Sequence, residues 1–235
     1  MEPRSPNPNP EPPVPVLKAA VLASGRGSNL QALIDARRDG GLPVDIVLVA
    51  GDKAQALALR RAEAAGIPTL ALDPRGYASR AAYDADLFAR IAASGAELVV
   101  LAGFMRILDA SVLGPWSGRI INIHPSLLPR YTGLHTHRRA LAAGDAEHGS
   151  SVHFVTAELD GGPVLAQVRI PVLPGDTPET LAERLLAHEH RLLVASVAAI
   201  AAGRFKLASE GVLHDGALLR APLQLRDGEL CAATA

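Results

Sequence analysis

Short apolar runs alternate with longer stretches of helical periodicity through the first half of the chain. The apolar runs of strand length cover residues 17–23, 44–50, 69–72 and 98–102. The helical patterns cover residues 30–38, about 54–65 and about 80–94. Strands separated by helices are typical of right-handed βαβ units and a mostly parallel sheet. Near-continuous apolar runs such as ELVVLAG agree, because a parallel sheet is covered on both faces.

The pattern changes beyond Gly149. SSVHFVTA and GPVLAQVRIPVL are extended segments joined by ELDGGP, a cluster of turn residues that predicts a hairpin or adjoining strands at a sheet edge. A long helix follows over about 178–202. We therefore predict one doubly wound, mostly parallel α/β sheet with an antiparallel edge in the C-terminal half. The predicted units are a disordered proline-rich leader at 1–16, a single domain at 17–220 and a tail at 221–235.

The composition limits which kinds of binding partner and which cell compartment we expect for this protein. The 235 residues are enough for one α/β domain, and a net charge of -1 gives no overall basic footprint for nucleic acid or an anionic membrane. No apolar run reaches the roughly 20 residues of a membrane helix, and the leader lacks the apolar core of a signal peptide. Cys231 has no second cysteine to pair with, which indicates a reducing compartment. We expect a cytoplasmic protein.

The segment RIINIHPSLLP places Asn122 and His124 two residues apart at the end of an apolar run. Successive strand residues point to opposite sides, so these two side chains should share one face. Pro125 cannot donate to a sheet ladder and should end the strand. Ligands of open α/β sheets usually bind at the carboxyl ends of strands. The pair is therefore a candidate site. The alternative is an ordinary strand end, at which Asn122 caps a turn and His124 has only a packing role.

A second candidate is SGRGSN, which links the first strand to the following helix. Its glycines allow close backbone approach, and the free N–H groups at a helix start favour an anion such as phosphate. The Gly-Lys-Ser/Thr of a Walker loop is missing, and Leu30 stands at the third-glycine spacing of a dinucleotide fingerprint. Asp52 could still imitate the acidic residue that holds an NAD ribose. A phosphosugar, a dinucleotide and a plain tight turn all remain open here.

Histidines recur in close pairs, which raises a metal hypothesis. They are His135 with His137, His148 with His153, and His188 with His190. Imidazoles are common zinc ligands, but no HExxH or similar spacing occurs. We predict no metal site and surface or packing roles for most of these side chains.

Asp160 gives the Asn122–His124 pair a possible partner. If its glycine-rich turn folds beside His124, the carboxylate would stabilise an imidazolium; a local Asx-turn is the other interpretation. A cationic histidine beside an amide makes a donor pair suited to a developing oxyanion, which favours acyl transfer. The motif has no serine or cysteine nucleophile, so direct attack by a substrate amine is the simpler chemistry.

Several longer segments resemble the glycinamide ribonucleotide formyltransferase family of purine biosynthesis. They are VLASGRGSNLQAL, LAGFMRIL, NIHPSLLPRYTGLHTH, EHGSSVHFVTAELDGGPVLAQ and HEH, and the resemblance spans about 16–219. It implies a Rossmann-like formyltransferase fold. It also implies transfer of the formyl group of 10-formyltetrahydrofolate, a co-substrate, to the amine of phosphoribosylglycinamide.

The resemblance also implies roles for individual residues. Asn122 and His124 match the catalytic amide and imidazole, and Asp160 matches the essential carboxylate that keeps His124 protonated. The positions matching phosphoribosylglycinamide contacts are Gly27, Ser28 and Asn29 for the phosphate and Glu189 for the ribose. The positions matching folate contacts are Arg80, Met105, Arg106, Ile107, Leu108, Asn122, Thr156, Ala157, Glu158, Leu159 and Asp160. Leu101 and Phe104 suit a neighbouring apolar pteridine pocket or ordinary core.

Two positions depart from the family pattern, and other functions stay open. Leu186 stands where some relatives carry a polar phosphosugar contact, and Thr132 replaces a frequent proline. The related formyltetrahydrofolate hydrolases and methionyl-tRNA formyltransferases share the Asn-x-His logic, but usually carry a further regulatory or RNA-binding domain. An NAD-dependent oxidoreductase would use SGRGSN and Asp52, and a non-catalytic nucleotide-binding module is the simplest alternative. We expect the protein to bind small molecules and neither nucleic acid nor membrane. We expect it to be a monomer or a homodimer.

Overall fold

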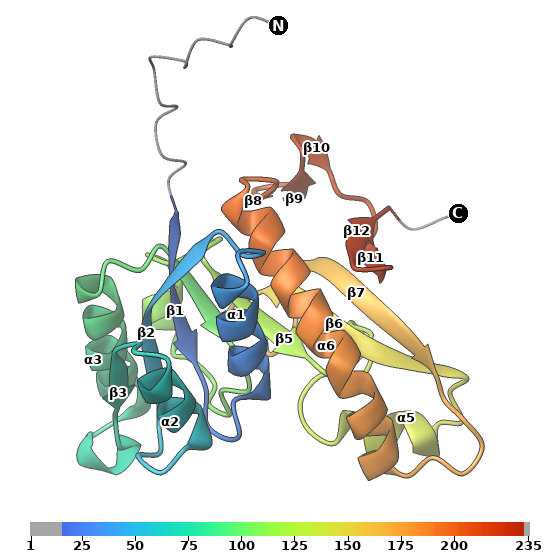
Figure 1. The fold of residues 1–235 in the computed structure, drawn as a ribbon, viewed down its shortest axis with the longest axis horizontal. Coiled ribbons are helices and arrows are strands. Elements are labelled where there is room, and N and C mark those ends of the chain that lie inside the picture. The colour runs from blue at the N-terminus through green and yellow to red at the C-terminus, as the bar shows by residue number, and fades with distance from the viewer. Residues whose placement is uncertain (1–15, 233–235) are drawn as a thin grey trace, which may run out of the picture.

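A computed structural model describes residues 16–232, which form one large sheet covered by helices and a second, small sheet (Figure 1). Five parallel strands make the N-terminal half of the large sheet: β1 (Leu17–Leu22), β2 (Val44–Gly51), β3 (Thr69–Ala71), β4 (Leu98–Leu101) and β5 (Ile120–His124). The intervening helical elements are α1 (Ser28–Arg38), α2 (Leu57–Ala64), the 3₁₀ turn η1 (Pro74–Gly76), α3 (Arg80–Ala93) and α4 (Ala110–Leu113). The predicted βαβ alternation and mixed α/β fold are confirmed.

The C-terminal half reverses the direction of the sheet. After α5 (Thr136–Ala142), β6 (Glu147–Phe154) pairs antiparallel with both β5 and β7 (Val164–Pro171). The long helix α6 (Pro178–Ala201) then crosses the sheet face turned to the viewer in Figure 1. Thr177 and Thr180 form a reciprocal capping box at its start, and Pro178 fits the first turn, where no N–H partner is needed. The predicted helix at 178–202 is confirmed.

Alternating strand residues divide the interior into two cores. Ala19 and Val21 of β1 pack with α1, α2 and α6, whereas Ala20 and Leu22 pack with α3 and α4. Because both faces of the parallel strands are covered, their sequences are almost continuously apolar. This explains why the runs at 17–23 and 98–102 lack the polar alternation of a one-sided sheet.

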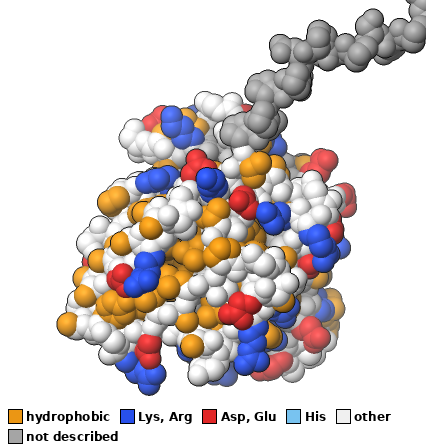
Figure 2. Space-filling view, turned by 60° about the vertical axis from the view of Figure 1, so that its left-hand side comes forward, with side chains coloured by type: hydrophobic (Ala, Val, Ile, Leu, Met, Phe, Trp, Pro, Cys, Tyr) orange, Lys and Arg blue, Asp and Glu red, His pale blue; other side chains and the backbone are white. Residues whose placement is uncertain are grey.

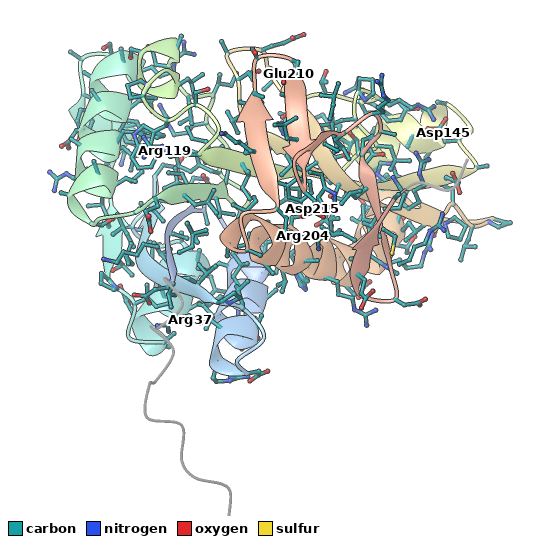
Figure 3. All side chains as sticks on the ribbon, turned by 90° about the horizontal axis from the view of Figure 1, so that it is seen from above. Arg37, Arg119, Asp145, Arg204, Glu210 and Asp215 are labelled. Atoms are coloured by element: carbon teal, nitrogen blue, oxygen red, sulfur yellow. The ribbon has the colours of Figure 1, made fainter. Side chains whose placement is uncertain are left out.

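The chain beyond α6 differs from the prediction. Its strands are β8 (Phe205–Ala208), β9 (Gly211–His214), β10 (Ala217–Leu218), β11 (Leu223–Arg226) and β12 (Glu229–Cys231). The first three form the small antiparallel sheet, where Arg204 and Asp215 lie side by side and pair at 2.9 Å (Figure 3). β11 pairs in parallel with β7, so the order of the large sheet is β12-β11-β7-β6-β5-β4-β1-β2-β3.

The hairpin of β6 and β7 was expected at a sheet edge, and that expectation is wrong. β11 and β12 cover β7, because its outer backbone groups still need partners. Residues of the predicted tail at 221–235 thus supply two strands of the large sheet. The predicted leader at 1–16 lies outside the described residues except for its last one.

The surface carries charges of both signs. On the face shown in Figure 2, Lys and Arg side chains are scattered among Asp and Glu around exposed hydrophobic side chains, without a continuous basic stripe. Within residues 16–232, no helix is both long and apolar enough to cross a membrane.

Candidate active site

A cavity of about 710 Å³ opens where β1, β4 and β5 end. β1 and β4 are neighbours in the sheet, although the chain leaves β1 toward β2 on its other side. Such a reversal of strand order separates the following loops and leaves a ligand crevice. Ser24 ties the two loops together: its N–H donates to the Gly103 carbonyl at 3.0 Å, and its Oγ accepts from Met105 N at 3.0 Å.

The cavity brings together all but one of the residues that the sequence predicted for catalysis and substrate contact. The lining includes Gly27, Ser28, Asn29, Met105, Arg106, Ile107, Leu108, Asn122, His124, Thr156, Ala157, Glu158, Leu159, Asp160 and Glu189. Leu101 and Phe104 line it as well, as does Leu186. Arg80 does not; its guanidinium lies 3.5 Å from Asp109, just beyond the Met105–Leu108 loop.

β5 presents Asn122 and His124 to this cavity on one face, as predicted. Ile121 and Ile123 point into the opposite core with less than a tenth of their surface exposed. The strand ends at His124, immediately before Pro125, which also agrees with the prediction. The site therefore starts from two polar side chains whose direction is set by strand alternation.

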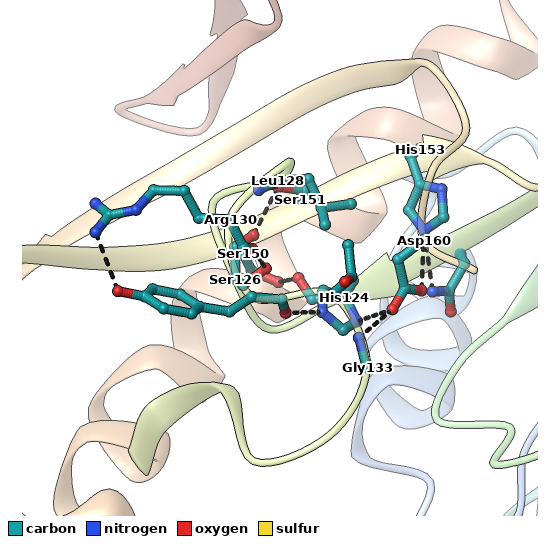
Figure 4. A network of polar contacts seen from close by, with 12 residues as sticks. His124, Ser126, Leu128, Arg130, Gly133, Ser150, Ser151, His153 and Asp160 are labelled. Carbon is teal, nitrogen blue, oxygen red and sulfur yellow. Dashed lines mark hydrogen bonds and ion pairs between the residues drawn. The ribbon is translucent and has the colours of Figure 1, made fainter. Parts of the chain in front are cut away.

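The hydrogen bonds around His124 fix its protonation (Figure 4). Its Nε2 lies 2.9 Å from the carbonyl oxygen of Tyr131, so Nε2 must donate a proton. Its Nδ1 lies 3.4 Å from Asp160 Oδ2. A carboxylate oxygen has no proton to donate, so an attractive contact requires a proton on Nδ1 too. The geometry fits an imidazolium held by an aspartate, both nearly buried.

Asp160 is itself held by the backbone. Its Oδ2 accepts a 2.8 Å hydrogen bond from the N–H of Gly133, and its own backbone is left-handed, at φ 52°. Tyr131 and His135, in the segment between β5 and α5, also have positive φ values, of 56° and 60°. Such conformations are unfavourable for side-chain-bearing residues and concentrate at functional sites. The His124 imidazole thus faces a carboxylate whose position is fixed by the backbone.

Asn122 is oriented by a second histidine. His153 Nδ1 donates to the Phe154 carbonyl at 2.9 Å, so its Nε2 carries the lone pair of the neutral ring. Burial lowers the pKa of His153 and keeps it neutral. Asn122 Nδ2 lies 3.1 Å from that Nε2 and must donate to it. This assignment leaves the second amide N–H of Asn122 free to bind a substrate oxygen.

Buried serines fix the turn that follows β5. Ser150 Oγ donates to the His124 carbonyl and Ser151 Oγ to the Ser126 carbonyl, both at 2.7 Å (Figure 4). Ser151 Oγ also accepts from Leu128 N at 3.1 Å. Both serines are fully buried on β6. Strand β6 therefore holds the catalytic strand end in place through side chains as well as through the sheet ladder.

The glycine turn before α1 requires a glycine at position 27. Gly27 is the N-cap of α1 with φ 70°, and a Cβ there would lie 2.7 Å from Ala58. The helix therefore starts at Ser28, two residues earlier than the predicted 30–38. Its first N–H groups have no side-chain cap and lie beside the cavity, which suits them for an anion.

Glu189 projects into the cavity from α6 and is nearly buried. Burial raises the pKa of its carboxyl group to about 7, even though interactions with Ser150 and Asn29 act in the opposite direction. A carboxyl group kept partly neutral at physiological pH can both donate and accept hydrogen bonds. It is therefore suited to neutral hydroxyl groups.

The raised pKa of Glu189 predicts a pH-dependent gain in stability for Glu189→Gln. The folded-state pKa of about 7 lies above the ordinary glutamate pKa of 4.5, so ionisation of the folded protein costs stability as pH rises between the two values. At pH 8 we expect the glutamine variant to be more stable by on the order of 2–3 kcal/mol, and most of that gain to vanish by pH 5. Thermal unfolding at both pH values measures it. Glu183→Gln, at an exposed carboxyl on the same helix, is the control; an equal gain at both pH values would contradict the assignment.

Two sequence hypotheses are not supported by the geometry. Asp52 does not line the cavity, so the residue proposed to hold an NAD ribose is not placed to do so. Among the described residues, no three side chains of His, Cys, Asp or Glu are grouped as metal ligands would be.

Sequence reasoning missed several contributors to the cavity. Gly133 and Tyr131 act through backbone groups, which leave no side-chain signature. His153 lies directly opposite Asn122 on the antiparallel neighbour β6, and only the strand register reveals that pairing. His137, a residue of α5, lines the cavity. Its spacing from His135 in the sequence suggested only a metal site.

Most of the chain is similar to known proteins. Residues 17–197 match the formyl transferase family model. A phosphoribosylglycinamide formyltransferase of Escherichia coli (strain K12) is 46% identical over 200 residues, which cover 85% of this chain and 94% of that protein. A trifunctional purine biosynthetic protein adenosine-3 of Drosophila pseudoobscura pseudoobscura is 46% identical over 198 residues, 83% of this chain and 14% of that protein. The solved structure of a phosphoribosylglycinamide formyltransferase from Coxiella burnetii is 45% identical, with a TM-score of 0.85, covering 89% of this chain and 99% of that one.

Proposed function

The chain belongs to the formyl transferase family, among its phosphoribosylglycinamide formyltransferases of purine biosynthesis, and from this we propose a donor and a mechanism. The formyl donor is 10-formyltetrahydrofolate, and the acceptor is the amine of phosphoribosylglycinamide. The amine attacks the formyl carbon directly, without an acyl-enzyme intermediate. Asn122, His124 and Asp160 are the catalytic residues.

One observation carries this proposal: an amide N–H and a protonated imidazole reach the cavity from the same strand face, with a fixed carboxylate behind the imidazole. Attack on the formyl carbon places negative charge on its oxygen. The free amide N–H of Asn122 and the Nδ1–H of His124 are donors of the type that stabilises this charge. The 3.4 Å contact to Asp160 is long for a charge-assisted hydrogen bond, so the same N–H can be shared with a substrate oxygen.

Collapse of the tetrahedral intermediate then releases tetrahydrofolate. The new C–N bond remains, and the bond between the formyl carbon and N10 of the folate breaks. N10 must receive a proton as it leaves, and His124 is the general acid that supplies it. Asp160 stabilises the imidazolium before this step and holds the ring in position throughout.

The two substrates occupy different ends of the cavity. The N–H groups of Gly27, Ser28 and Asn29 receive the phosphate, and Glu189 receives the ribose hydroxyls. The folate contacts are the Met105–Leu108 loop and the 156–160 loop, with Leu101 and Phe104 beside the pteridine. Arg80 is a proposed folate contact from family resemblance alone. Leu186 offers the phosphosugar no hydrogen bond, so the backbone of the glycine turn bears more of its recognition.

A two-substrate assay tests the proposal. Purified protein with 10-formyltetrahydrofolate and phosphoribosylglycinamide should release tetrahydrofolate only when both are present, without added metal, as followed by absorbance. Loss of the donor without the amine would indicate a formyltetrahydrofolate hydrolase instead. Absence of turnover together with reduction of added NAD would favour the oxidoreductase, and nucleotide binding alone would favour a binding module.

The remaining expectations follow from the same assignment. We expect a cytoplasmic enzyme that uses small-molecule substrates and no metal, with its catalytic unit within residues 17–220.

A further inference from the structure

The proposed transfer leaves one proton without a destination, and the inference below rests on that proposed function. The attacking amine becomes positively charged when its C–N bond forms, and it must lose a proton to give the neutral formamide. His124 is already protonated and supplies the leaving group. A second base that is neutral before the reaction would let the amine lose its proton before the C–N10 bond breaks, while His124 still holds its own.

A pair of histidines in edge-to-face contact lies beside the cavity. His137, near the start of α5, lines the cavity, whereas His148 on β6 is almost completely buried behind it. His148 Nε2 lies 3.0 Å from His137 Nδ1, and the two rings meet edge to face at 4.9 Å and 74°. A buried contact between two imidazoles requires one donor and one acceptor nitrogen.

The backbone decides which ring donates. The backbone of Pro125 lies near the His148 imidazole and raises the pKa of the ring, and its carbonyl can only accept a hydrogen bond. Because His148 Nε2 faces His137, the nitrogen left to donate to Pro125 is Nδ1. A neutral His148 then has a lone pair on Nε2, and His137 Nδ1 must donate its proton to it. The lone pair of His137 is consequently on Nε2, the nitrogen that His148 does not occupy.

Both rings are held neutral. Burial lowers the pKa of His148 to about 4 and also lowers the pKa of His137. The nearby charge of His124 lowers both values further, and the carboxylate of Asp145 opposes this only at His148. A neutral imidazole has a free lone pair and can take a proton as a general base.

The basic groups next to Asn122 are already engaged. His135, Glu158 and Glu189 also line the cavity, but His135 and Glu158 are exposed to solvent, and Glu189 is assigned to the ribose hydroxyls. The Nε2 lone pair of His153 accepts from Asn122, and both nitrogens of His124 donate. Asp160 Oδ2 accepts from Gly133 and faces His124. Among the described residues, no hydrogen-bond partner is shown for His137 Nε2. This nitrogen is also absent from the set of fully buried polar atoms that lack a partner. It is thus a free acceptor on a residue that lines the same cavity as Asn122 and His124.

We propose that His137 is the general base of the transfer, and that His148 is a positioning residue that fixes the His137 tautomer. The amine nitrogen bonds to the formyl carbon and gives a proton to His137 Nε2. The C–N10 bond then breaks, and N10 takes a proton from His124 Nδ1. One proton has left the amine and one has reached N10. His137 returns its proton to solvent and His124 regains one, which restores the free enzyme.

The tautomer can be tested without measuring catalysis. Two-bond ¹H–¹⁵N correlation spectra of histidine-labelled wild-type protein distinguish protonated from unprotonated ring nitrogens. We expect His137 to be protonated at Nδ1 and unprotonated at Nε2 at pH 7.5, and His148→Phe to lose this preference. A proton on Nε2 of wild-type His137 would overturn the inference, whatever the fate of the proposed function.

Chemical rescue tests the proton transfer. We expect His137→Ala to lower kcat by about 10²-fold, the lower range for loss of a general base. Added imidazole should restore at least tenfold with saturation, and rescue by substituted imidazoles should increase with their basicity. His214→Ala, which removes an imidazole from the distant small sheet, should keep wild-type kcat and show no rescue.

The outcomes separate the inference from the proposed function. His137→Ala with wild-type kcat, or with a reduced kcat that imidazole does not restore although phosphoribosylglycinamide still binds by calorimetry, would overturn the general-base role. His148→Phe should lower kcat about tenfold without change in KM for either substrate and should not respond to imidazole. A wild-type enzyme that fails to transfer formyl at all would instead overturn the proposed function.

Discussion

Asp160→Asn is expected to lower kcat by about 10³–10⁴ while leaving the fold intact. Asparagine is nearly isosteric and can still accept the hydrogen bond from Gly133 N. It also tolerates the left-handed backbone at this position better than most residues. It cannot balance an imidazolium at 3.4 Å, so His124 loses the proton that it must donate. Replacing the aspartate of a serine-protease triad by asparagine costs a comparable factor, there because the histidine takes the wrong tautomer.

The measurement is single-turnover formyl transfer with both substrates saturating, which isolates the chemical step. Asp215→Asn is a matched control, because Asp215 is also an aspartate with positive φ, at 49°, but belongs to the small sheet. We expect its rate to stay within twofold of wild type. If Asp160→Asn kept more than a tenth of the wild-type rate, the carboxylate would not be essential to His124.

The N-terminal half of the fold was predictable because its signals are local. Buried parallel strands are apolar along their whole length, and each helix between them has its own periodicity. The last strands were not predictable, because LQLR at 223–226 is short and half polar. β11 exists because β7 leaves backbone groups open, and that condition depends on the rest of the sheet.

The candidate site, like the fold, has features with local sequence signals and features that depend on distant residues. Strand alternation alone placed Asn122 and His124 on one face, whereas the partner of each lies far away in sequence. Asp160 reaches its place through Gly133, 27 residues earlier, and Asn122 meets His153 only because of the antiparallel register between β5 and β6. Family resemblance supplied the roles of these residues, and the hydrogen bonds supply physical reasons for their protonation.

The two functional histidines of the proposed mechanism are prepared in opposite ways. His124 has a carbonyl and a carboxylate as neighbours, both of which require a donor, so the ring is held as a cation. His137 has a neutral, buried imidazole behind it and a cation nearby, so the ring is held neutral. Environments that separate the protonation of two groups are what acid and base assignments require.

Asn122→Ala is expected to lower the single-turnover rate by about 10²–10³, the usual cost of losing one oxyanion donor. The substitution removes the amide N–H that faces the cavity and leaves His153 Nε2 without its donor. Binding of phosphoribosylglycinamide should change little, because its proposed phosphate contacts lie on a different loop.

Gln224→Ala, which removes an amide from β11 away from the cavity, serves as the control and should leave the rate unchanged. Restoring the side-chain shape without the donor separates charge stabilisation from packing. Asn122→Asp restores the shape of the side chain but offers no N–H at neutral pH and adds a negative charge beside the developing oxyanion. It should therefore be at least as slow as Asn122→Ala. An alanine variant within twofold of wild type would remove Asn122 from the oxyanion site and leave His124 as the only side-chain donor proposed there.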